Sequence, residues 1–277
     1  MRRQPQLKIR KLFAGPYLFW AVSFIIIPLL MIVYYGLTDK TGAFTLMNLA
    51  KMADFENLKA LGLALLLSFV STVICLLMAY PLAMILSEKN VNQTSFIVLI
   101  FILPMWMNFL LRTLAWQTLL EKNGVINSVL SFLHLPQQSL INTPAAIVLG
   151  MVYNFLPFMV LPIYNVLSKI DKDVISAAKD LGANNFITFT RIILPLSIPG
   201  IISGITMVFV PSLTTFVISD LLGGSKILLI GNVIEQEFKQ GSNWHVGSGL
   251  SLVLMVFIIA SMALIAKYDK NGEGNAF

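Results

Sequence analysis

Residues 168–199 read SKIDKDVISAAKDLGANNFITFTRIILPLSIP, a charged segment that lies between two long apolar runs. The segment predicts two short helices joined by a turn. Ser168 or Asp171 is the expected N-cap of the first helix, and Gly182 is expected just beyond its C-terminus. A second short helix is expected to start near Asn184 or Asn185. Together these signals predict a compact helix–turn–helix across one end of a helical bundle.

The first of these helices has one apolar face, because Ile170, Val174, Ala178 and Leu181 recur at helical spacing. Ala177 and Ala178 are small, so another surface can approach the backbone closely. An amphipathic helix of this kind can rest on a membrane surface or dock into another protein. The spacing alone leaves both interpretations open.

The composition indicates a membrane protein. Of the 277 residues, 57% are hydrophobic and only 12% are charged, whereas about a quarter of the residues of a soluble domain are charged. The mean hydropathy is +0.83. Cys75 is the only cysteine and lies in an apolar run, so it forms no intrachain disulfide and suggests no metal site.

Six charge-poor runs are long enough to cross a bilayer core, which needs about 20 helical residues. Because backbone hydrogen bonds must be satisfied internally in lipid, these runs are expected to be helices. We therefore expect an all-α, polytopic protein with a single transmembrane domain over residues 1–277. The expected spans are about 13–37, 60–86, 95–119, 144–167, 198–219 and 247–266. The first run is too long for a cleaved signal peptide and is expected to be retained.

The distribution of Lys and Arg predicts the orientation of these spans. With the N-terminus in the cytoplasm, twelve of the 19 basic residues fall in cytoplasmic segments and six on the opposite side, with Arg112 inside a span. This arrangement places both termini and residues 168–195 in the cytoplasm. It also puts the whole net charge of +6 on that face, so the charge is a topology signal and does not indicate a nucleic-acid partner.

The sequence contains no pattern for catalysis. A phosphate-binding G-x-x-x-x-G-K-[ST] motif, a zinc-protease H-E-x-x-H motif and a nucleophile elbow are all missing from it. We therefore expect a non-enzymatic protein with no catalytic residues, no metal site and no cofactor of its own. If the protein carries out uphill transport, the energy must come from another subunit or from an ion gradient.

Candidate residues for a solute path are ionisable or aromatic groups in the spans. Arg112 in the third span and Asp220 at the end of the fifth are costly to bury unless they face water or a partner. Trp106, Trp116 and Tyr153 could offer aromatic faces to an ammonium group. The alternatives are that Arg112 and Asp220 pair or extend to the interface, and that the aromatic residues form an interface belt.

Residues 223–247 are predicted to contain a small amphipathic helix outside the cytoplasm. Ile230, Ile234 and Phe238 fall on one helical face, with Glu235 and Glu237 beside them. This apolar face could receive a docked partner or pack on the protein's own bundle.

The segment 168–195 resembles the EAA loop of ABC-importer permeases. The shared pattern is Ala177-Ala178, three residues, Gly182, nine residues, Ile192, one residue and Leu194-Pro195, while Ser176 stands at the family's Glu position. The resemblance implies that the helix before the glycine is a coupling helix that docks into a cytoplasmic ATPase. The residues that it places at or near this contact are Ser176, Ala177, Ala178, Asp180, Leu181, Gly182, Ala183, Leu194 and Pro195.

Further runs resemble the spermidine/putrescine importer permeases of the PotB type. They occupy residues 112–116, 156–162, 220–224, 230–232 and 251–255. The resemblance implies the type I importer permease fold in the cytoplasmic (inner) membrane. It also implies a second homologous permease, two ATPase copies that bind ATP and Mg²⁺, and an extracytoplasmic polyamine-binding protein. The alternatives are a permease of the same build for another solute, and a gradient-driven carrier or channel that acts without an ATPase.

Overall fold

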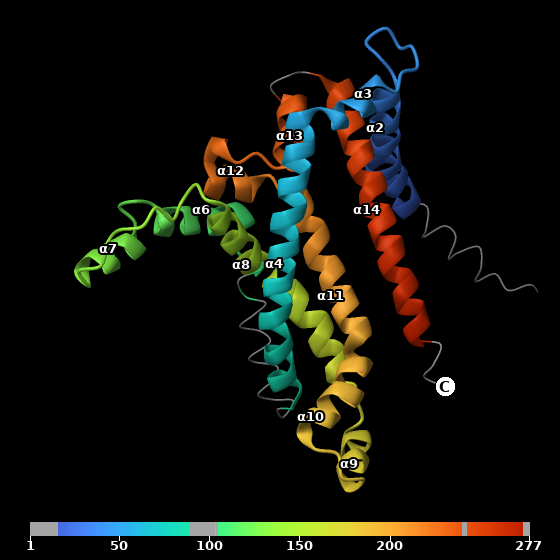
Figure 1. Ribbon diagram of the computed structural model, residues 1–277. Coiled ribbons are helices and arrows are strands. Elements are labelled where there is room, and N and C mark those ends of the chain that lie inside the picture. Colours follow the sequence, from blue (N-terminus) through green and yellow to red (C-terminus); the bar gives the residue numbers. More distant parts are fainter. Residues whose placement is uncertain (1–15, 89–102, 104, 240–242, 274–277) are drawn as a thin grey trace, which may run out of the picture. The chain divides into compact units, whose positions relative to one another are not determined.

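The computed structural model describes residues 16–88, 103, 105–239 and 243–273 (Figure 1). In these residues the regular structure is helical, apart from one isolated bridge between Thr38 and Phe44. The predicted all-α class is confirmed. The chain forms two compact units, one of residues 1–58 and 234–257 and a larger one of residues 59–233 and 258–277. Each unit is described by itself.

The larger unit is built on α8 (Pro144–Leu167) and α11 (Leu194–Thr214), which pack along each other. Glycines allow the close approach: a Cβ at Gly200 would lie 3.0 Å from the carbonyl oxygen of Pro162, and one at Gly204 would lie 2.6 Å from the sulfur of Met159. The long helix α4 (Phe55–Glu88) joins α11 through a 2.9 Å hydrogen bond between Tyr80 and Ser197. Close contacts at glycines and one part-buried hydroxyl pair therefore join the helices of this bundle.

Shorter helices complete the larger unit. They are α6 (Phe109–Leu120), α7 (Val125–Phe132), α9 (Lys172–Asp180), α10 (Asn185–Thr188), α12 (Val217–Gly223), a 3₁₀ turn at Gly224–Lys226 and the start of α13 (Ile230–Lys239). Of these, α12 packs against α6 and α8, where it meets the surface left open by Gly150.

The smaller unit contains α2 (Ile27–Leu37), which follows a π-helical turn at Val22–Ile26, and α3 (Met47–Ala50), which leads into a 3₁₀ turn at Lys51–Ala53. It also contains the first part of α14 (Trp244–Glu273). The buried amide of Asn48 donates to the carbonyl oxygens of Gly36 and Thr38 at 3.2 and 2.8 Å, which ties α3 to the end of α2.

Five helical runs in the described residues are long and apolar enough to cross a membrane. They are Pro16–Gly36, Phe55–Ser87, Pro144–Leu167, Asn185–Thr214 and Trp244–Ala263. The expected third span, about 95–119, falls partly outside the described residues, and its described part contains α6, which begins after the N-cap Asn108. The six-span count therefore stays a prediction.

The helix expected at about 198–219 has different bounds in the structure. The helical run starts earlier, at Asn185, and stops at Thr214 because Thr215 is extended, with φ −67° and ψ 138°. Gly231 of α13 packs against this end, where a Cβ would lie 2.7 Å from the carbonyl oxygen of Thr214. Asp220 therefore belongs to the separate helix α12 and not to the end of the span.

Candidate functional site

The predicted cytoplasmic helix forms as α9. Its N-cap is Asp171, whose carboxylate accepts a hydrogen bond from the backbone N–H of Asp173 at 2.9 Å. Ser168, the other expected cap, ends α8 instead. Asp173 in the first turn and Lys179 in the last match the helix dipole. Local sequence signals alone therefore account for where this short helix begins.

The turn after α9 depends on Gly182. Its φ of +87° lies in the left-handed region that favours glycine. The Gly182 N–H donates to the carbonyl oxygen of Lys179 at 2.9 Å, and the next N–H, from Ala183, donates to that of Ala178 at 3.0 Å. A Cβ on Gly182 would meet open space within 4 Å. The glycine is thus needed for its backbone conformation and not for close packing.

The chain then returns to the bundle through one continuous helical run. Asn184 caps α10, accepting from the Ile187 N–H at 2.8 Å. A π-helical turn, Phe189–Ile193, joins α10 to α11, whose first turn contains the exposed Pro195 after the half-buried Leu194. Because no loop interrupts residues 185–214, a displacement of α10 can pass directly into α11.

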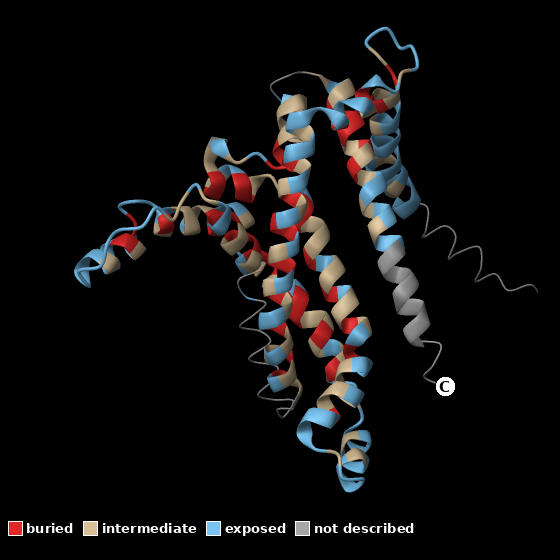
Figure 2. Ribbon diagram, viewed as in Figure 1, coloured by how far each residue is buried: buried red, intermediate tan, exposed pale blue. Residues whose placement is uncertain are grey.

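The turn after α9 and the helix α10 present exposed apolar side chains. Leu181 is 90% exposed and Phe186 is 74% exposed, and α9 buries none of its residues. Figure 2 shows this end of the larger unit in the colours of exposed and intermediate residues. We call residues 172–187 the coupling knuckle. Exposed apolar side chains on a polar helix–turn–helix suit a surface that docks into a protein.

The remaining predicted coupling residues lie on the same knuckle. Ser176 is exposed, and its hydroxyl donates to the carbonyl oxygen of Lys172 at 3.0 Å. Ala177 and Asp180 are exposed, and Ala178 is half-buried. At the family's Glu position the Ser176 side chain therefore turns back onto its own helix and presents no charge.

Three of the five candidate path residues gather in one cluster. Arg112 of α6 is buried, and its guanidinium carbon lies 5.8 Å from the ring centroid of Tyr153 on α8. The rings of Trp116 and Tyr153 meet edge to face at 5.3 Å and 70°. Helical spacing on α6 places Arg112 and Trp116 one turn apart, so both reach the same tyrosine.

The other two candidates lie elsewhere. Trp106 precedes α6 and is 77% exposed, as in an interface belt. Asp220 is exposed on α12, and one carboxylate oxygen accepts a hydrogen bond from the side-chain amide of Asn232. The five candidate residues for a solute path therefore form one aromatic–arginine cluster, with two residues that lie apart from it.

Asn232 lies in one of the runs that carry the resemblance, 230–232, but no role was predicted for it. It is fully buried, accepts from the Ser219 hydroxyl and from the Leu229 N–H, and donates to the Phe216 carbonyl oxygen as well as to Asp220. Every hydrogen-bonding position of its amide is used. The sequence feature that could have indicated this role is an Asn placed directly after Gly231, at the start of the apolar face of α13. Its role is to clamp α12 to α13 and to fix the carboxylate of Asp220.

The predicted amphipathic helix at 223–247 forms as α13. Ile230 is fully buried, and the Phe238 ring packs against Trp244 at a centroid distance of 5.7 Å and against Gly247. These contacts favour packing on the protein itself over an open docking face. In the described residues, no group of three or more His, Cys, Asp or Glu could hold a metal ion.

Comparisons with known proteins identify the family. The family model described as "Binding-protein-dependent transport system inner membrane component" matches residues 17–269. The spermidine/putrescine transport system permease protein PotB of Haemophilus influenzae is 35% identical over 260 residues, which cover 91% of each chain. PotB of Salmonella typhimurium strain SL1344 is 36% identical over 254 residues, covering 89% of this chain and 88% of that protein.

The fold also matches solved structures. A bacterial ABC transporter involved in the import of the acidic polysaccharide alginate gives a TM-score of 0.80 at 16% identity, over 97% of this chain and 96% of that chain. At this identity the likeness shows the fold alone, which is that of ABC-importer permeases. The predicted fold class, family and role as a transport subunit are confirmed. The chain belongs to the family of inner membrane components of binding-protein-dependent transport systems, in which it is a permease subunit and not an enzyme.

Proposed function

We propose that this chain forms half of the translocation path of an ATP-driven importer for polyamines such as spermidine and putrescine. The observation that carries the substrate class is the identity of about 35% to spermidine/putrescine permeases over about nine-tenths of the chain. The partners in this proposal are a second homologous permease, an ATPase dimer and an extracytoplasmic polyamine-binding protein. ATP and Mg²⁺ are bound by the ATPase, and this chain holds neither.

In this proposal both termini and the coupling knuckle face the cytoplasm. The support is the excess of Lys and Arg in the segments that this orientation places inside. The exposed Leu181 and Phe186 offer the ATPase an apolar contact surface. Gly182 sets the direction of the turn that presents them. Membrane lipid surrounds the apolar helices, and nucleic acid is no partner.

The proposed coupling is mechanical. Closure of the ATPase dimer on ATP displaces the knuckle, and the uninterrupted run 185–214 carries that displacement into the bundle. Because α11 packs closely on α8, which bears Tyr153, the displacement reaches the aromatic–arginine cluster. The bundle then changes from inward-facing to outward-facing.

The path itself is proposed to bind polyamines weakly. Arg112 already lies over the ring of Tyr153, so this face repels a polycation instead of holding it. The exposed carboxylate of Asp220 supplies an attraction, fixed in place by Asn232. A path with few attractive charges is easy to leave, and selectivity then resides in the binding protein.

The coupling proposal is tested with Leu181→Asp. This side chain is exposed, so the substitution should not disturb the fold, but it puts a charge into the apolar surface that contacts the ATPase. We expect the ATPase to stop co-purifying with the permease and ATP-dependent spermidine uptake to be lost. The matched control is Leu133→Asp, an exposed leucine after α7 that the proposed topology places outside. Normal uptake and ATPase binding in the Leu181 variant would contradict docking at the knuckle.

The substrate class is tested on the partner. The binding protein that co-purifies with this chain should gain thermal stability from spermidine or putrescine and none from anionic solutes. Protection by an anion instead would favour the alternative of a permease of the same build for another solute.

A further inference from the structure

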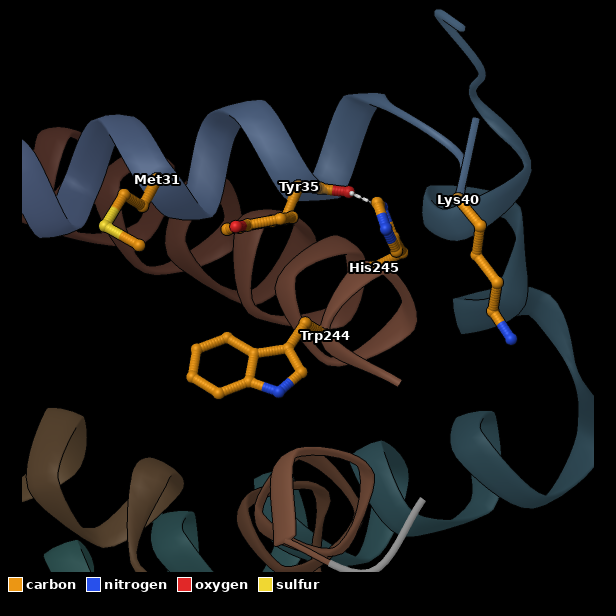
Figure 3. A pocket seen from close by; sticks show the side chains of 5 residues that line it. All are labelled: Met31, Tyr35, Lys40, Trp244 and His245. Atoms are coloured by element: carbon orange, nitrogen blue, oxygen red, sulfur yellow. Dashed lines mark hydrogen bonds between the residues drawn. The ribbon is translucent and has the colours of Figure 1, made fainter. Parts of the chain in front are cut away.

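A pocket of about 500 Å³ lies in the smaller unit, between the end of α2 and the start of α14 (Figure 3). Met31 and Tyr35 line it from α2, Lys40 from the loop that follows, and Trp244 and His245 from α14. Its size is in the range of roughly 300–1,000 Å³ found for small-ligand sites. We call it the α2–α14 pocket.

The aromatic walls of this pocket are held in place by the fold. The Nδ1 of His245 lies 2.6 Å from the carbonyl oxygen of Thr38 and 3.1 Å from that of Tyr35, and it must carry a hydrogen because carbonyl oxygens only accept. His245 thereby caps the C-terminal end of α2. The Tyr35 ring packs edge to face on the His245 ring at 5.4 Å and lies 6.2 Å from the Trp244 ring.

The lining of the pocket favours an anion. Lys40 supplies a positive charge, and the Trp244 indole N–H and the Tyr35 hydroxyl are further donors. None of the five lining residues is acidic. The neighbouring Asp39 is engaged in its own loop, where it accepts from the Thr41 hydroxyl at 2.6 Å and from the Thr41 N–H at 2.8 Å. These hydrogen bonds lower the pKa of the Asp39 carboxyl from its usual value, so it stays ionised; its charge acts on His245, and Lys40 must offset it for an anion to bind.

The position of the pocket specifies the source of that anion. It lies where two apolar helical runs, Pro16–Gly36 and Trp244–Ala263, reach their ends, with Lys40 just beyond them. Trp and Tyr at span ends mark the headgroup level of a bilayer. Below this level α2 leaves apolar side chains open, with Met31 44% and Leu30 60% exposed. A ligand with a phosphate at one end and acyl chains at the other fits this arrangement, in which a lysine lies beyond the aromatic residues and exposed apolar side chains lie below them.

We propose that the α2–α14 pocket binds the headgroup of an anionic membrane phospholipid, whose phosphate meets Lys40 and whose acyl chains lie along the open apolar side of α2. Such a lipid holds the end of α2 against the start of α14, where His245 already caps the helix. The site needs neither polyamine nor ATP, so it can be tested independently of the transport function.

The test uses native mass spectrometry of the full chain in detergent, titrated with phosphatidylglycerol and, separately, with phosphatidylcholine of the same acyl chains. We expect tighter binding of the first phosphatidylglycerol than of the first phosphatidylcholine. Lys40→Gln should weaken phosphatidylglycerol binding by about fivefold, the effect of one Lys at an anionic lipid surface. Lys40→Arg should restore it. Lys122→Gln removes an exposed lysine of the larger unit and should bind as the wild type does.

Three results would overturn the proposal. Equal phosphatidylglycerol binding by the wild type and Lys40→Gln would show that Lys40 holds no phosphate. Equal binding of the two lipids would remove the charge preference. Competition by inorganic phosphate at the concentration of the lipid would show that the pocket takes free phosphate and not a lipid headgroup.

Discussion

Asn232 shows how one buried amide can organise a site. Its side chain holds Ser219, the backbone of Phe216 and Leu229, and the carboxylate of Asp220, all within the larger unit. Because Ser219 and Leu229 are fully buried, loss of the amide leaves the hydroxyl of the first and the N–H of the second without compensation. Asn232 is therefore central to the position of α12.

We predict that Asn232→Ala destabilises the protein by about 3 kcal/mol, because several buried hydrogen bonds lose their partner together. The single cysteine provides the measurement: Cys75 is fully buried, so its labelling by a thiol-reactive dye during heating reports unfolding. The transition should shift down by several degrees. Asn57→Ala removes one exposed hydrogen bond, to the Lys51 carbonyl oxygen, and should cost less than about 1 kcal/mol. Equal shifts of the thermal transition in the two variants would contradict the role of Asn232 in holding α12 to α13.

Gly182 and Gly62 can be compared directly, because they differ in backbone conformation and not in the space around them. A Cβ on either residue would meet nothing within 4 Å, but only Gly182 has a positive φ. We predict that Gly182→Ala costs about 1 kcal/mol of local stability, because the left-handed conformation strains an alanine. Hydrogen exchange should become faster across the coupling knuckle. Gly62→Ala lies within the helix α4 and should stabilise it by roughly 0.5–1 kcal/mol. Unchanged exchange in the Gly182 variant would contradict this reading of the turn.

Among the elements, the run from α10 through the π-helical turn to α11 has the most direct mechanical role. It is helical from Asn185 to Thr214, although Pro199 and Pro211 donate no backbone hydrogen bond, and it continues from the exposed knuckle into the packed bundle. A helix transmits displacement, whereas a flexible joint absorbs it.

We predict that two glycines inserted after Ile193 uncouple the transporter. The knuckle is left intact, so the ATPase should still co-purify and still hydrolyse ATP, while ATP-dependent uptake falls to background. The same insertion after Gly42, in the loop that follows α2, controls for the added length. Uptake that survives the first insertion would show that force does not travel along this run.

Local signals in the sequence predicted where α9 begins and where it ends. The cap at Asp171 and the glycine turn at Gly182 are short-range features, and both appear as expected. The break at Thr215 was not predicted in the same way, and the residue that packs against it, Gly231, is distant in sequence. The cluster of Arg112, Trp116 and Tyr153 likewise depends on which faces of α6 and α8 meet, and helical periodicity does not specify this.

At the scale of the whole molecule, composition and the charge pattern predicted a membrane protein, and the family match confirms an inner membrane component. Exposed apolar residues are expected on helices that face lipid, and they are most frequent along Pro16–Gly36, where a stretch of 18 residues contains no buried one. The knuckle differs from that surface, since its apolar side chains follow a charged helix.

The most direct measurement is spermidine uptake into proteoliposomes under three conditions: this chain alone, the assembled complex with its ATPase and binding protein, and that complex without ATP. The ATP-driven importer predicts uptake only in the complete complex with ATP, and no uptake by the chain alone under an ion gradient. Uptake by the chain alone, or uptake by the complex without ATP, would contradict it and establish a carrier or channel instead.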